Sequence, residues 1–108
     1  MNIRRAWTID VSPEEPDRGR AVWIRAIDIE GQPVPDAPIE AVVDGDGTLM
    51  ASAVVKQRVE TTDSEGMTSF AWWEYPRFSP RRALHSTVYF ESTDPRVLSI
   101  SAPVFMEF

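Results

Sequence analysis

The chain has 108 residues, the size of a single domain that can bury one hydrophobic core. Its 17 acidic and 11 basic residues give a net charge of -6, which opposes a broad electrostatic grip on the phosphates of nucleic acid. It has no cysteine, which excludes disulfides, thiolate metal sites and cysteine nucleophiles. We therefore expect one domain over residues 1–108 that does not bind nucleic acid.

The sequence shows no membrane or export signal. No window reaches about 18 apolar residues, so a membrane-spanning helix is not expected. The N-terminal segment carries two arginines but no apolar run of signal-peptide length. If Met1 is the natural first residue, this predicts a cytoplasmic location. The compartment is otherwise left open.

Extended segments alternate with turn sequences from the start of the chain. Ile3 to Val11 and Arg20 to Ile29 place apolar residues two positions apart, the period of a β-strand, and a loop with two prolines separates them. One row of the second segment is purely apolar and should face a core: Val22, Ile24 and Ala26. The opposite row mixes Arg25 with Trp23 and is more apolar than a solvent-facing row requires.

Turn residues divide the middle of the chain. Glu30 to Pro33 and Asp63 to Gly66 have the composition of tight turns, and Asp44 to Gly47 forms a glycine-rich corner. Met50 to Lys56 fits either a short strand or a loop over the core. The strands expected between and after these turns are Ile39–Val43, Val59–Thr62, a segment with Thr68, Phe70 and Trp72 facing inward, Ser86–Thr93 and Val97–Phe108.

The last expected strand contains Pro103, which cannot donate a ladder hydrogen bond and so favours an edge position or a bulge. Glu74 to Arg82 contains two prolines and is expected to be a loop. No segment shows the period of about 3.6 residues that marks a helix. The pattern therefore predicts an all-β antiparallel sandwich of about seven to eight strands.

The sequences IDIEGQPVPDAPIEAVVDGDGTL and TTDSEGMTSFAW resemble the bacterial immunoglobulin-like (Big) domains of the invasin and intimin type. The resemblance covers about half of the chain and implies an immunoglobulin-like sandwich. It also implies the family's usual setting, which is tandem repeats in surface adhesins. The matching positions are mostly turn requirements and carry no chemistry. They are Asp28, Gly31, Pro33, Val34, Pro35, Ile39, Gly47, Leu49, Thr62, Asp63 and Gly66.

Candidate metal and catalytic residues are few. Asp44 and Asp46 could open a calcium loop, but an EF-hand would require glycine at position 49 and glutamate at 55, where the chain has Leu49 and Val55. A plain turn is expected, with a looser calcium site that adds Asp63 or Glu65 as the alternative. His85 is the single histidine and has no neighbouring ligand pattern for zinc. We expect no cofactor and no enzymatic activity.

Aromatic residues are more numerous than one small core requires. Strand alternation predicts that several lie opposite the inward rows, beside arginine, which is the composition of protein-interface hot spots. The candidate interaction surface is Trp23, Arg25, Trp73, Tyr75, Tyr89 and Phe105. The alternative is that loop residues 76–82 cover these side chains.

We therefore expect a non-catalytic module that acts through protein contact, as a subunit or accessory domain. Its surface would be the outward aromatic face, or an edge strand such as Val97–Phe108 that pairs with a second copy. The alternative is a carbohydrate- or small-ligand-binding module in which Trp73 and Tyr75 stack on sugar rings.

Overall fold

A computed structural model describes residues 3–10, 19–74, 85–101 and 104–107, with the backbone alone for residues 3, 4, 10 and 104–107. The described chain is all-β. Its eight strands are β1 (Ile3–Asp10), β2 (Gly19–Ile27), β3 (Pro38–Gly45), β4 (Gln57–Thr61), β5 (Met67–Trp73), β6 (His85–Ser92), β7 (Ser99–Ile100) and β8 (Val104–Glu107).

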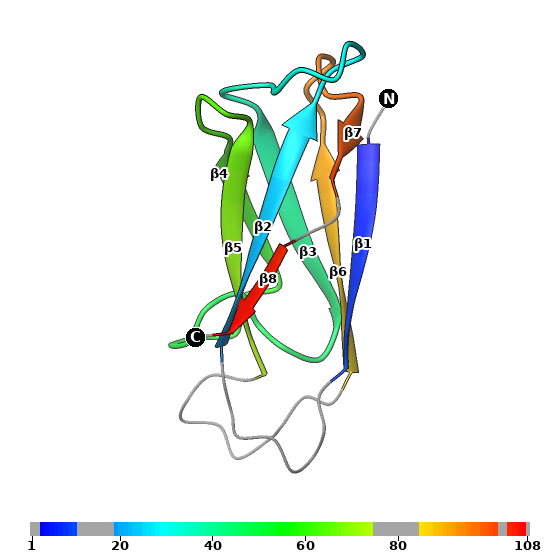
Figure 1. The fold of residues 1–108 in the computed structure, drawn as a ribbon. Coiled ribbons are helices and arrows are strands. Elements are labelled where there is room, and N and C mark those ends of the chain that lie inside the picture. The colour runs from blue at the N-terminus through cyan, green and yellow to red at the C-terminus, as the bar shows by residue number, and fades with distance from the viewer. Residues whose placement is uncertain (1–2, 11–18, 75–84, 102–103, 108) are drawn as a thin grey trace.

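Two antiparallel sheets form the sandwich (Figure 1). One sheet has the order β1-β6-β3-β4, and the other has β5 beside β2, with β7 and β8 along the opposite side of β2. The predicted all-β antiparallel sandwich is confirmed. The predicted last strand is present as two short strands, β7 and β8, and Pro103 between them lies outside the described residues.

Several boundaries differ from the predicted ones for local reasons. Strand β2 ends at Ile27 because Asp28 begins a turn. Residues Met50–Lys56 form no strand, which decides between the two alternatives left open by their sequence. Most of the predicted loop Glu74–Arg82, and the proline-containing loop before β2, lie outside the described residues.

The terminal strands lie in unexpected sheets. In an immunoglobulin constant domain the first strand joins the sheet of the second and fifth, and the last strand joins the sheet of the third and sixth. The central pairings β2–β5 and β3–β6 follow that order. Here, however, β1 pairs β6, and β7 and β8 pair β2, so the first strand and the two C-terminal strands have exchanged sheets relative to that domain.

The core lies between the inward rows of the two sheets. The predicted row of β2 is buried, and Phe70 and Phe90 meet across the sheets with ring centroids 5.5 Å apart. Burying a side chain of this size stabilises the fold by about 1.5–3 kcal/mol. The largest apolar side chains that are fully buried are Trp72, Phe90, Ile24, Ile39, Leu49, Val22 and Val88.

A buried ion pair lies at one end of this core. The Arg20 Nη1 and Glu74 Oε1 atoms are 4.0 Å apart, and both side chains are almost fully buried. The Arg20 guanidinium also lies 5.4 Å from the centroid of the Trp72 ring. The ion pair and the ring contact therefore hold two charged side chains inside an otherwise apolar core.

Gly47 is fixed by its contact with Trp72. It has φ +101°, which glycine tolerates better than other residues, and an added Cβ would overlap the Trp72 indole. Gly31 also has a positive φ of +78°, but a Cβ there would meet nothing within 4 Å. Comparison of substitutions at the two glycines therefore distinguishes the effect of backbone strain from the effect of overpacking.

We predict that Gly47→Ala lowers the free energy of unfolding by about 2–5 kcal/mol, because backbone strain and overpacking add. Gly31→Ala should cost only the strain, about 1–2 kcal/mol. Urea unfolding of the two variants measures both values. Equal losses would show that the Trp72 contact is not what requires Gly47.

Candidate functional site

Two turns at one end of the sandwich have the same construction. Asp28 Oδ1 accepts hydrogen bonds from the backbone N–H groups of Glu30 (2.9 Å) and Gln32 (3.0 Å). Asp63 Oδ1 accepts from Glu65 (2.8 Å) and Met67 (3.0 Å) in the same pattern. Each carboxylate satisfies N–H groups that the turn leaves without a strand partner. The sequence D-x-E-G therefore fixes both turns locally.

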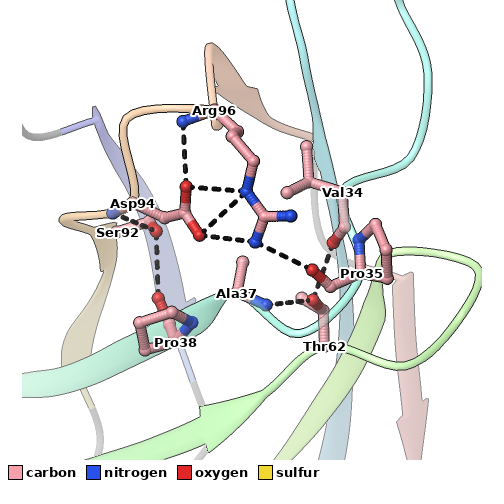
Figure 2. A network of polar contacts seen from close by, with 8 residues as sticks. All are labelled: Val34, Pro35, Ala37, Pro38, Thr62, Ser92, Asp94 and Arg96. Carbon is pink, nitrogen blue, oxygen red and sulfur yellow. Dashed lines mark hydrogen bonds and ion pairs between the residues drawn. The ribbon is translucent and has the colours of Figure 1, made fainter.

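Thr62 joins these two turns. Its Oγ1 donates to the carbonyl of Val34 (2.7 Å) and accepts from the N–H of Ala37 (2.8 Å), as Figure 2 shows. The Thr62 side chain is buried, so both bonds are shielded from water. The segment before β3 is thereby held against the end of β4.

A third loop is attached through Arg96. The Asp94 carboxylate accepts from the Arg96 backbone N–H (2.9 Å), Nε (3.1 Å) and Nη2 (2.7 Å), and Nη2 also donates to the carbonyl of Pro35 at 3.0 Å (Figure 2). Hydrogen bonds from Arg96 hold the pKa of Asp94 below its ordinary value, and Asp94 raises the pKa of Arg96. Arg96 therefore joins the loop after β6 to the loop after β2.

A hollow of about 460 Å³ lies between these two loops. We call it the loop-end hollow, and its walls are Ile29, Pro33, Pro35, Pro95, Arg96 and Leu98. Ile29 is 82% exposed and Leu98 is 52% exposed. The buried Val34 and Val97 also line it, and Asp28 contributes the second charged group. An apolar hollow with a few polar groups is the usual form of a binding site.

The predicted aromatic residues do not form one surface. Trp23 is 37% exposed and shares the outer face of the β2–β5 sheet with Arg25 and the partly buried Trp73. Tyr89 lies on the outer face of the other sheet, since its neighbours Val88 and Phe90 point into the core. Alternation within a strand predicts which residues face outward, but a sandwich has two outer faces.

Of the two remaining candidates, one lies outside the described residues and the other is described by its backbone alone. Tyr75 lies outside the described residues. The backbone of Phe105 pairs with that of Val22 in β2, and its side chain is not among those described. The candidate residues that the structure brings onto one face are therefore Trp23, Arg25 and Trp73.

The glycine-rich corner holds a cation of the chain itself. Lys56 Nζ donates to the carbonyl oxygens of Gly45 (2.9 Å) and Gly47. Burial lowers the pKa of Lys56, and nearby Asp46 opposes that effect. Gly45 lies at one end of β3 and Pro38 at the other. The Asp63 turn lies beside Pro38, so Asp63 and Glu65 do not approach the glycine-rich corner. Within the described ranges no group of three or more His, Cys, Asp or Glu side chains could hold a metal ion.

Ile29, Leu98 and Arg96 were not predicted from the sequence to be binding-site residues. A signal for Ile29 was available, because a large apolar residue directly after Asp28 in a tight turn has no place in the core. Leu98 offered no such signal, since it falls in a segment that alternates like a strand. Only the fold brings these distant residues to one hollow.

Comparison of the chain with protein-family models, with curated proteins and with solved structures gives no match. The resemblance to bacterial immunoglobulin-like domains stays a prediction from the sequence. Across the part of the chain that the structure describes, no helix is long and apolar enough to cross a bilayer.

We predict a pH-dependent coupling between Asp94 and Arg96, measurable with Asp94→Asn, Arg96→Gln and the double variant. Because the folded-state pKa of Asp94 lies below its ordinary value of 3.8, the coupling should be complete above that value and should be lost as pH falls through the folded-state pKa. Chemical unfolding at several pH values gives the coupling free energy. A coupling that persists undiminished in strong acid would contradict this assignment.

Proposed function

We propose that the chain is a non-catalytic immunoglobulin-like module of the bacterial type that binds another protein through the loop-end hollow. The observation that carries the proposal is that two large apolar side chains, Ile29 and Leu98, stand exposed at one hollow. Apolar exposure of this kind around a concave site is typical of contact surfaces.

The loops that form the hollow are preorganised for binding. The Asp28 turn, the Thr62 bonds and the Arg96 bridge fix their backbone without help from a ligand. A partner that binds rigid loops loses less conformational entropy than one that must order them. Loops at the end of a sandwich are also where immunoglobulin-like domains carry their binding sites.

The polar groups around the hollow define the partner's chemistry. Arg96 Nη1 makes no hydrogen bond within the described chain, whereas Nε and Nη2 are both engaged. A protein segment that places an apolar side chain against Ile29 and Leu98 could present a carbonyl or carboxylate oxygen to Nη1. We infer that the partner contributes such an extended segment.

The test is selection of a displayed random peptide library on the wild-type chain. Enriched peptides should bind Ile29→Asp at least about tenfold more weakly, because a carboxylate in an apolar contact is costly to bury. Val54→Asp is the matched control, since Val54 is also exposed, at 61%, but lies outside the hollow. Absence of enrichment, or equal binding to Ile29→Asp, would contradict the proposal.

A glycan-binding face is the second candidate function. On the outer face of the β2–β5 sheet the small pair Ala21 and Ala71 lies between Trp23 and Trp73 in the register. Two indole groups on either side of small residues offer apolar ring faces against which the C–H faces of successive sugar rings can pack.

If this face binds glycans, an oligosaccharide panel should change tryptophan fluorescence of the wild-type chain, and Trp23→Ala should abolish the change. Tyr89→Ala should keep it, because Tyr89 lies on the other sheet. A panel that leaves the emission unchanged would remove this candidate, and a response that survives Trp23→Ala would place the glycan elsewhere.

A further inference from the structure

Strand β4 is an open edge of its sheet. It pairs with β3 on one side, and no strand lies on its other side in the described structure (Figure 1). Val59 at its centre is 54% exposed, and Arg58 lies next to it in the sequence. The β5 edge differs, because Thr48 pairs with Trp73 at one end of that strand.

The register with β3 shows which backbone groups of β4 are free. Hydrogen bonds from Val43 N–H to the Lys56 carbonyl (2.7 Å) and from Thr62 N–H to the Ala37 carbonyl (2.9 Å) flank the strand. Along an antiparallel strand, every second residue directs its backbone N–H and C=O groups toward a given neighbouring strand. Residues 56, 58, 60 and 62 therefore direct theirs toward β3. Gln57, Val59 and Thr61 therefore direct N–H and C=O groups away from the sheet.

We propose that β4 pairs antiparallel with β4 of a second copy of this chain, about a twofold axis at Val59. Val59 then pairs with the second copy's Val59, and Gln57 with its Thr61, so every outward backbone group of the strand gains a partner. The two four-stranded sheets become one continuous sheet. This surface is separate from the loop-end hollow, and the inference does not rest on the proposed function.

Charge selects this register. Arg58 lies directly opposite the second copy's Glu60, and Glu60 opposite its Arg58, at the positions where facing side chains approach most closely. Within one chain Arg58 Nε already lies 2.9 Å from Glu60 Oε1, so four alternating charges would form one network. Opposite charges directly across an antiparallel pair are stabilising, and like charges are destabilising.

The neighbouring registers are penalised. Only odd-numbered residues direct backbone groups outward, so the pairing can shift only in steps that keep odd residues opposite odd residues. One such shift places Arg58 opposite the second copy's Arg58, and the other places Glu60 opposite its Glu60. Both remove backbone hydrogen bonds and bring like charges together.

Charged residues on an edge strand usually prevent pairing with other strands. Arg58 and Glu60 prevent pairing with most other strands, because a partner strand must carry opposite charges in the matching order and register. The sequence Arg58-Val59-Glu60 is its own complement when read antiparallel. The same charges that exclude unrelated strands therefore favour a second copy.

The test is a charge exchange measured by sedimentation equilibrium over a range of concentrations. The wild-type chain should show a monomer–dimer equilibrium. Arg58→Glu and Glu60→Arg should each weaken self-association at least about tenfold, because two attractive pairs become repulsive. The double variant R58E/E60R restores opposite charges and should dimerise again. Mixing the two single variants should give a heterodimer, since one strand is then wholly acidic and the other wholly basic.

Cross-linking gives an independent measurement. The chain has no cysteine, so Val59→Cys introduces a single thiol at the twofold axis. The paired Cα atoms would lie about 5.5 Å apart, within the range for a disulfide. Oxidation should yield a covalent dimer, whereas Val54→Cys, which is also exposed but lies outside β4, should not form one at the same rate.

Circular dichroism confirms that each variant is folded, since both charged side chains are at the surface. A wild-type chain that stays monomeric at its highest attainable concentration would overturn the proposal. A dimer that neither single charge reversal weakens, or that Val59→Cys does not cross-link, would also overturn it, because the interface would then lie elsewhere.

Discussion

The contact between the inner faces of the two sheets is the constraint on which the structure depends. Phe70 of β5 meets Phe90 of β6 across the core, and Trp72 fills the adjacent space against Gly47. Large rings packed this closely allow little sliding of one sheet over the other. The strand ends are therefore fixed in space, and the aspartates of the turns can satisfy backbone groups whose positions are already set.

The loop end and the β4 edge differ in how far their backbone hydrogen-bonding groups are satisfied within the chain. At the loop end, side chains of the turns accept the hydrogen bonds of the turn N–H groups. The groups still open to an outside contact are Ile29, Leu98 and Arg96 Nη1. On β4 the Arg58 and Glu60 side chains pair with each other, but the outward backbone groups have no partner within the described chain. No residue of β4 lines the hollow, so the two surfaces do not overlap.

The sequence predicts what is local. Alternation identified the buried row of β2, and turn composition identified the Asp63–Gly66 turn, because both patterns depend on neighbouring residues. It did not predict which sheet a strand joins. That depends on pairing between distant segments, so Tyr89 and Trp23 were assigned to one face although they lie on two. The hydrogen bonds from Lys56 to the glycine-rich corner were not predicted either, because they too join segments that are separated in the sequence.

The residues that carry the family resemblance are those the fold itself requires. The side-chain oxygens of Asp28, Thr62 and Asp63 form hydrogen bonds with backbone groups in and beside the turns. Gly66 has no room for a Cβ beside Ala26 and Val34. Such positions are constrained whatever the module binds. Ile29, Leu98, Arg58 and Glu60 meet no such requirement, since each is at the surface and outside the core. Because folding does not account for these side chains, they are the positions where binding specificity can reside.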